Sequence, residues 1–390
     1  MIKFIKPNLQ ESHDMFKQCV SKSTMSGQYK ESKYDSEHQE LNWQLSSLSK
    51  KIHNCIHRRD ESVLRQYLFG KFEFSLSVKL TNIQADMYEH YIENRSELHE
   101  SKKDNVLSHY NNTLLISAHP GSFNFRASFS HSKEKKKAEW WEDFDHRGVN
   151  QEILKEYDFT QSNKMALLCE ILKICAKLKE KVLVFSQSLT TLTVIEYFIA
   201  KMNDETGDWQ KNVNYYRMDG EDKCVDHREL MCEKFNNPEE QDIRFFLIST
   251  KAGGIGINLT GASRVIIFDP CWNPTHDVNS NLLASKVQCI YRAYRLGQKK
   301  PVFVYRLIAV GTFEEKVHKR QIMKGAMTAC LMDGQRIDRL FSQHEIQDLF
   351  DISNIRPERA ECEKDPEKDA VLAELIRNSS MILSWNEIAN

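Results

Sequence analysis

Residues 243–259 read IRFFLISTKAGGIGINL, and this stretch decides the fold class. Its first seven residues are mostly apolar, which is typical of a strand buried on both faces of a sheet. Glycines follow at 253, 254 and 256, and they let a backbone approach a ligand closely and expose its amide donors. In α/β sheets, ligands bind at the carboxyl ends of such strands. A tight structural turn is the alternative interpretation of the glycines.

The same alternation of apolar strands and amphipathic helices extends in both directions along the chain. Strands are predicted at 72–80, 181–186, 215–219, 243–249, 264–269 and 302–308, and helices at 81–91, 164–179, 190–202, 227–235 and from 370. Thr81 and Gln84 form a capping-box pattern at the start of one of these helices. The pattern predicts an α/β fold, a parallel sheet with helices on both faces, preceded and followed by mostly helical segments.

The composition is that of an ordinary globular protein, with 390 residues, 41% hydrophobic and 28% charged. No apolar run approaches the ~18 residues of a membrane span, and the first ten residues lack the apolar core of a signal peptide, so we expect an intracellular protein. Ten cysteines are present without any Cys-x-x-Cys pair, which argues against a zinc site, and we expect no metal ligands. We expect a linker at 95–160, one α/β domain at 161–345 and a charged tail with a short helix at 346–390.

The net charge of −1 gives no general signature of nucleic-acid binding, but the charge is unevenly distributed. Nine Lys or Arg residues stand against two Glu between Arg292 and Lys324. Such a stretch can form a phosphate-binding face on a neutral protein, and a solvated helix surface is the equal alternative.

Three loops after predicted strands carry candidate chemistry. Ser249, Thr250 and Lys251 supply hydroxyl donors and a cation suited to phosphate. The second loop is Pro270-Cys271-Trp272-Asn273-Pro274, where a rigid turn is the plain alternative. In the third, Arg292 and Arg295 stand three residues apart and would share one face of a helix, where two guanidinium groups can stabilise the charge of a transferring phosphoryl group. Such an arginine pair alone is usually a surface salt-bridge partner.

Taken in order, these motifs resemble the C-terminal RecA-like lobe of superfamily-two helicases of the Swi/Snf branch. The matching series is VLVFSQS, YYRMDG, LISTKAGGIGINL, RVIIFD, WNP and RAYRLGQ. Further stretches, among them FIKPNL, LSVKLTNIQADMY, KMALLCEIL, HKRQIMK and VLAELI, are similar to the ATRX-like subgroup. The resemblance covers nearly the whole chain and implies that residues 1–94 are the end of a first helicase lobe with its protrusion.

The resemblance also implies roles for single residues. Arg295 resembles an arginine finger that reaches ATP, and Arg292 is its partner. The residues implied on the nucleotide side are Gly254, Gly256, Asn258 and Gln298. Those implied on the DNA side are Ser186, Gln187, Ser249, Thr250, Lys251, Trp272 and Asn273. Phosphate contacts position a motor on DNA without reading its sequence.

The activity that the resemblance implies is an ATP-dependent translocase that moves along double-stranded DNA of nucleosomes in the nucleus. Its cofactor would be ATP with Mg²⁺, held only together with a first lobe that supplies a Gly-x-x-x-x-Gly-Lys-Ser/Thr loop and an acidic box. These 390 residues contain neither motif, so we expect this chain alone to bind no ATP and to be inactive, as a truncated product would be. The alternative is a non-catalytic DNA- or chromatin-binding module. A Rossmann-type enzyme is a poor match because Gln187-Ser188-Leu189, without glycine, follows the strand at 181–186.

One departure from the family pattern precedes the arginine pair. Nine residues, Asn281 to Cys289, intervene between Asp277-Val278-Asn279-Ser280 and Ile290. On a continuous helix they would add about 900°, half a turn out of phase. We therefore expect them to loop out, or else to rotate both arginines away from the cleft.

Overall fold

The computed structural model forms two compact units, Met1–Val63 with His318–Asp351 and Leu64–Val317 with Ile352–Asn390. The structure describes residues 66–98, 106–123, 125, 158–207, 209–220, 224–250, 257–270, 289–319, 321, 351–357 and 368–388, nearly all of them in the second unit. All the strands and helices named in the next paragraphs belong to that second unit. None of the helices in these ranges is both long and apolar enough to cross a bilayer.

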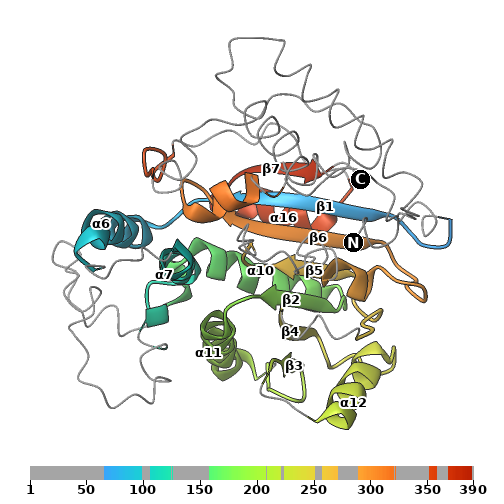
Figure 1. The fold of residues 1–390 in the computed structure, drawn as a ribbon. Coiled ribbons are helices and arrows are strands. Elements are labelled where there is room, and N and C mark those ends of the chain that lie inside the picture. The colour runs from blue at the N-terminus through green and yellow to red at the C-terminus, as the bar shows by residue number, and fades with distance from the viewer. Residues whose placement is uncertain are drawn as a thin grey trace, which may run out of the picture. The chain divides into compact units, whose positions relative to one another are not determined.

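A seven-stranded sheet in the order β3-β4-β2-β5-β6-β1-β7 forms the centre of this unit (Figure 1). The strands are β1 Lys71–Val78, β2 Val182–Ser186, β3 Tyr215–Met218, β4 Phe245–Ser249, β5 Arg264–Ile267, β6 Val302–Ala309 and β7 Ile382–Ile388. Every neighbouring pair is parallel except β1 and β7. Each of the six strands predicted from the sequence is present within two residues of its expected ends.

Most of the helices also lie where the periodicity of the sequence predicts them. They are α6 Asn82–Leu98, α7 Val106–Ala118, α10 Asn163–Lys177, α11 Leu189–Thr206, α12 Val225–Asn236 and α16 Ala370–Asn378, with a 3-10 turn η2 at Phe159–Gln161. The capping box before α6 is confirmed: the Gln84 amide donates to Thr81 Oγ1 at 3.3 Å, and the Thr81 amide donates to Gln84 Oε1 at 3.2 Å.

Alternate side chains of the strands feed two separate hydrophobic cores, because successive residues of a strand point to opposite faces. On one face, Val184 and Tyr305 join a core with side chains of α10, α11 and α16 such as Leu168, Phe198 and Leu372. On the other face, Leu183, Phe246 and Val304 pack with Phe235 of α12 and with Ile290. The predicted α/β sheet with helices on both faces is therefore confirmed.

The sheet takes in segments from outside the range 161–345. β1 pairs in parallel with β6, with Lys71 opposite Val302, and β7 closes the edge on the other side of β1. A helix, α7, lies inside the predicted linker 95–160, and its Leu115 and Ile116 are buried against Tyr88 and Tyr91 of α6. The predicted domain boundaries stay predictions, but the sheet is built from more of the chain than they enclose.

Candidate functional site

The carboxyl ends of β2 and β4 bring four predicted site residues together. Ser186 and Ser249 are opposite each other in the parallel register, and the Thr250 amide donates to the Ser186 carbonyl at 2.9 Å. Gln187 follows Ser186 directly. The parallel sheet thus places these residues at one edge, as the sequence predicts.

A buried carboxylate, Asp269, holds this edge from the end of β5. The Ser186 hydroxyl donates to Asp269 Oδ2, and the Gln187 amide donates to Asp269 Oδ1 at 2.9 Å. Asp269 is 4% exposed and Ser186 is fully buried. Asp269 was not among the residues predicted for the site, and its position at the end of the apolar strand RVIIFD was the one available signal.

The side chain of Gln187 also points into the protein. Its Nε2 donates to the Pro270 carbonyl at 2.7 Å and to the Tyr110 hydroxyl at 2.9 Å, and Tyr110 in turn donates to the same carbonyl. Ser186 and Gln187 were expected to donate to DNA phosphates. Their donors instead satisfy groups inside the chain, so a direct phosphate contact would require these bonds to break.

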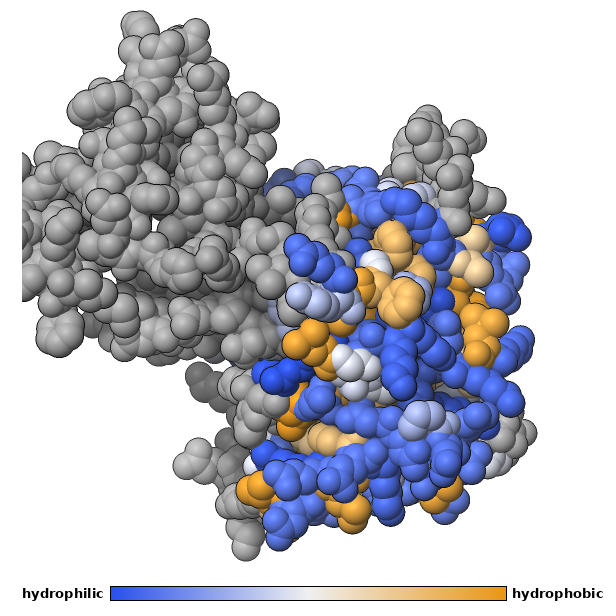
Figure 2. Space-filling model, turned by 90° about the vertical axis from the view of Figure 1, so that its right-hand side faces the viewer, coloured by the Kyte–Doolittle hydropathy of each residue, from blue (hydrophilic) through white to orange (hydrophobic). Residues whose placement is uncertain are grey.

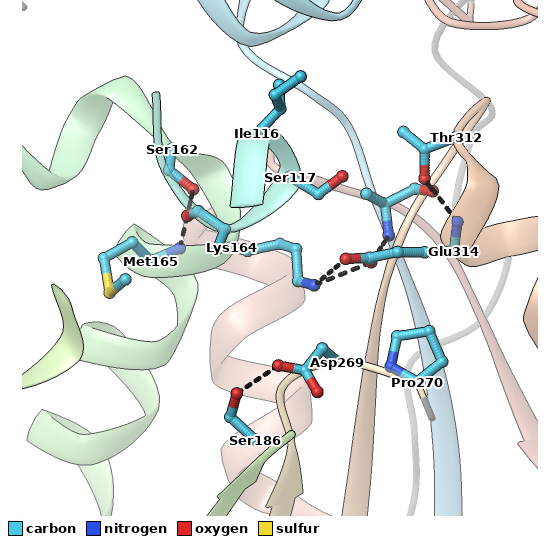
Figure 3. Close-up of polar contacts among 12 residues, drawn as sticks. Ile116, Ser117, Ser162, Lys164, Met165, Ser186, Asp269, Pro270, Thr312 and Glu314 are labelled. Atoms are coloured by element: carbon cyan, nitrogen blue, oxygen red, sulfur yellow. Dashed lines mark hydrogen bonds and ion pairs between the residues drawn. The ribbon is translucent and has the colours of Figure 1, made fainter. Parts of the chain in front are cut away.

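A buried ion pair lies near Asp269, between Lys164 in the first turn of α10 and Glu314 after β6 (Figure 3). Lys164 Nζ is 2.9 Å and 3.1 Å from the two carboxylate oxygens, and both side chains are 1% exposed. The Ala309 amide donates to Glu314 Oε2 at 3.2 Å, and Lys164 Nζ lies 4.7 Å from the centre of the Phe268 ring. The ion pair therefore ties α10 to the carboxyl end of the sheet.

The backbone turn before Glu314 depends on Gly311. Its φ of +72° lies in the left-handed region, and a Cβ there would come within 2.2 Å of the Asn354 carbonyl oxygen. Thr312 then donates through Oγ1 to the Ala309 carbonyl and accepts from the Glu314 amide at 3.1 Å. This turn directs Glu314 inward, toward Lys164.

Burial raises the pKa of Asp269 from its ordinary 3.8 to about 6. The hydrogen bonds from Ser186 and Gln187 and the charge of Lys164 lower the pKa, whereas the charge of Glu314 raises it. Burial also raises the pKa of Glu314, although Lys164 opposes this. Desolvation therefore outweighs the donors around Asp269.

We expect the stability of the wild-type chain relative to Asp269→Asn to fall as the pH rises from about 4 to about 6. The folded-state pKa lies above the unfolded value, so the stabilisation by the proton is full below 3.8 and is lost as the pH passes through about 6. The loss should be up to about 3 kcal/mol. Urea unfolding of both chains at several pH values measures this loss. If the difference between their free energies of unfolding did not change with pH, the raised pKa of Asp269 would be contradicted.

The second group of predicted residues surrounds Arg292, on the sheet face that carries α12. Arg292 is 7% exposed, its Nη1 lies 3.5 Å from the Ile257 carbonyl, and its Nε finds no hydrogen-bond partner among the described residues. Burial and the charge of Arg295 lower its pKa, while Cys289 opposes them. A buried guanidinium with an unsatisfied donor fits an anion such as a phosphate oxygen.

The two arginines do not share a helix face, because the described helix ends at Ala293. Arg295 lies in the turn that follows, where its amide donates to the Ala293 carbonyl at 3.1 Å, and its side chain is exposed. The shared helix face predicted from the spacing is therefore wrong at this point. The pair is one buried and one exposed cation on either side of a helix end.

Gln298 was predicted on the nucleotide side, but its amide is fully used inside the chain. Its Nε2 donates to the Thr260, Ala262 and Ala293 carbonyls at 3.0, 2.7 and 3.1 Å. Its Oε1 accepts from the amides of Lys299 and Lys300 at 2.9 and 3.0 Å. It fastens the turn after Arg295 to the segment that follows the glycine-rich loop.

Asn258 is exposed in this segment, and its carbonyl accepts from Asn236 Nδ2 at 2.8 Å. Asn236 at the end of α12 also accepts from the Gly261 amide at 2.9 Å. A Cβ at Gly261 would approach the Phe235 carbonyl oxygen to 2.6 Å, so the helix end and this segment fit together only with glycine here. The placement of Asn258 on the nucleotide side stays a prediction.

Several expectations fall outside the described residues. They concern Lys251, Gly254, Gly256, Trp272, Asn273 and most of the insertion Asn281–Cys289. Within the described ranges, no group of three His, Cys, Asp or Glu side chains is arranged to hold a metal ion.

Among the described residues of the basic stretch from Arg292 onward, the cations are partly buried and partly exposed. Arg292 is buried, and Arg306 lies in β6 with its Nη2 2.6 Å from Glu73 Oε2 of β1. Lys299 and Lys300 are exposed in the turn before β6. The face shown in Figure 2 is largely hydrophilic, with its hydrophobic residues in small separate groups.

The helicase conserved C-terminal domain family matches residues 163–297. This range contains β2 to β5 and both arginines. Over 67% of this chain, the sequence is 36% identical to human transcriptional regulator ATRX. Over 91% of this chain, it is 31% identical to protein CHROMATIN REMODELING 20 of Arabidopsis thaliana. It is a homologue of the ATRX-type SNF2 ATPases. The chain spans 11% and 26% of the length of these two relatives.

Two solved structures of ATPase domains are also similar to this chain. The C-terminal part of the Fun30 ATPase domain is 23% identical, with a TM-score of 0.43, over 70% of this chain and 100% of that one. The Sulfolobus solfataricus SWI2/SNF2 ATPase core in complex with dsDNA is 24% identical, with a TM-score of 0.46, over 86% of this chain and 59% of that one.

Proposed function

We propose that this chain is the second motor lobe of an ATP-dependent translocase that acts on double-stranded DNA in chromatin. The observation that carries the proposal is the buried, incompletely satisfied guanidinium of Arg292 beside Arg295, inside the range that matches the helicase family. Two neighbouring guanidinium groups suit the charge of a transferring phosphoryl group. The names of the relatives place them in chromatin and transcription, so we propose a nuclear location and nucleosomes as partners.

ATP with Mg²⁺ is the cofactor that the SNF2 family uses. In this chain Arg292 and Arg295 would contact its phosphates, and Gly254, Gly256 and Asn258 would line the nucleotide. These 390 residues contain no Gly-x-x-x-x-Gly-Lys-Ser/Thr loop to cradle the β- and γ-phosphates. We therefore propose that a polypeptide of these residues alone does not hydrolyse ATP, and that turnover requires a nucleotide-binding lobe beside it.

The DNA side is proposed at the carboxyl ends of β2, β4 and β5. Thr250 is half-buried at this edge and leads into Lys251, while Asp269 and Pro270 lead into Trp272 and Asn273. Hydroxyl, amide and ammonium donors at a sheet edge suit a phosphate backbone and carry no sequence information. We expect weak binding to duplex DNA that depends steeply on salt.

Replacing Lys251 by Ala tests this edge. If Lys251 neutralises one phosphate, the slope of log K against log salt should fall by ~0.9. Lys177→Ala is the matched control, because this exposed lysine ends α10 near the amino ends of the strands. Titration of labelled duplex DNA at several salt concentrations measures both slopes. Equal slopes in the wild type and Lys251→Ala would place the DNA elsewhere.

A further inference from the structure

Tyr110 of α7 joins the two loops that lead into the proposed DNA contacts. Its hydroxyl is bonded to both the Pro270 carbonyl and Gln187 Nε2, and it is fully buried. Its ring packs against Phe313, with 5.4 Å between the ring centres. One loop continues from Pro270 to Trp272 and Asn273. The other loop, residues 186–188, is held to the strand end that leads to Lys251.

One backbone bond joins loop 186–188 to that strand end, and a carboxylate joins the loop to the end of β5. The Thr250 amide donates to the Ser186 carbonyl at 2.9 Å, next to the residue that we propose contacts phosphate. Asp269, which follows β5, accepts from the Ser186 hydroxyl and from the Gln187 amide. Loop 186–188 is therefore fixed by donors to Asp269, Pro270 and Tyr110 before any DNA is bound.

We propose that Tyr110 and Asp269 are positioning residues for DNA binding, which fix the ends of β2, β4 and β5 relative to one another. This inference rests on the proposed function and extends it to α7, a helix of the chain before the family match. Neither residue touches DNA in this arrangement, since both are buried. They act by holding Thr250 and Pro270, from which the donors for phosphate extend. Preorganised donors bind more tightly because less order has to be imposed on binding.

The test compares two buried tyrosines in the full chain. Tyr110→Phe removes the hydroxyl that joins the loops and keeps the ring on Phe313. Tyr88→Phe is the matched control, because its buried hydroxyl accepts from the Phe313 amide at 2.9 Å. Each variant should unfold at a slightly lower denaturant concentration than the wild type. Duplex DNA affinity should fall about tenfold for Tyr110→Phe and less than about twofold for Tyr88→Phe.

Two further variants separate positioning from general weakening. Asp269→Asn keeps one acceptor oxygen of two, and we expect it to weaken duplex binding in the same direction as Tyr110→Phe. In the double variant Tyr110→Phe with Lys251→Ala, the loss should be smaller than the product of the single losses, because Tyr110 acts partly through the segment of Lys251. A purely structural role would give independent losses.

The outcomes distinguish this inference from the function on which it rests. A wild-type chain that binds no duplex DNA at low salt contradicts the proposed function, and this inference with it. A wild-type chain that binds, with unchanged affinity in Tyr110→Phe or equal losses in both tyrosine variants, contradicts this inference alone.

Discussion

Replacing Lys164 by Met is expected to lower the free energy of unfolding by about 3–5 kcal/mol, because the change leaves Glu314 as an unpaired charge in the interior. Both side chains of the pair are 1% exposed, so water cannot replace the lost partner. The methionine fills most of the volume of the lysine stem, which keeps the cavity term small. The loss of the charge partner therefore dominates the effect.

The matched control is Lys368→Met. Lys368 forms an ion pair with Glu387 at 3.0 Å, but the two side chains are 56% and 38% exposed. Solvent screening limits such a pair to about 0–1 kcal/mol. The double variant Lys164→Met with Glu314→Gln should recover part of the loss, because it removes the unpaired carboxylate. Urea unfolding of the four chains measures this, and similar losses for Lys164→Met and Lys368→Met would show that the buried pair adds nothing to stability.

The same ion pair bears on the charge of Asp269. Burial is the main cause of the raised pKa of Asp269; the charge of Lys164 lowers this pKa and the charge of Glu314 raises it. At neutral pH the ionised Asp269 costs stability, yet it accepts the two bonds that fix loop 186–188. Replacing Lys164, Glu314 and Asp269 by hydrophobic residues would remove these charges from the interior, but it would also remove the hydrogen bonds that fix loop 186–188. This is the usual relation between stability and function at a binding site.

The strands of the sheet could be predicted from the sequence because their apolar runs are short, continuous and bounded by polar residues. The order of the strands could not. β1 precedes its parallel neighbour β6 by more than two hundred residues, and no local pattern identifies such a pairing. β7 was missed altogether. Its residues Asn386 and Glu387 are exposed, as on the edge strand that it is, and they interrupt the apolar run that buried strands show.

The residue types of the candidate site could be predicted, but their directions could not. Ser186 and Gln187 have the hydroxyl and amide groups that suit a phosphate. Their partner Asp269 lies 83 and 82 residues further along the chain, and only the fold shows that it accepts their hydrogen bonds. The predicted helix face shared by Arg292 and Arg295 is wrong for a different reason. The i,i+3 rule holds only while a helix continues, and this helix ends between the two residues.

When Asn281–Cys289 is deleted and a nucleotide-binding lobe from an ATRX-type relative is joined ahead of residue 1, DNA-stimulated ATP hydrolysis is expected, and Arg295→Ala should lower the turnover by about 10³-fold or more. The side chain of Arg295, after the helix end, is exposed, so packing does not keep it from the added nucleotide-binding lobe, whereas Arg292 is buried within this chain. Arg292→Ala should also lower turnover, but with a loss of stability that Arg295→Ala does not share.

Lys299→Ala is the control, because it removes an exposed positive charge four residues from Arg295 without a proposed role at ATP. Its turnover should stay within about threefold of the parent protein, since a surface charge changes transition-state energies little. Phosphate release under saturating DNA measures all four proteins. If the parent binds DNA but releases no phosphate, or if Arg295→Ala matches Lys299→Ala, the chain is better described as a non-catalytic DNA-binding module. The unsatisfied donor on Arg292 would then have a ligand other than a nucleotide phosphate.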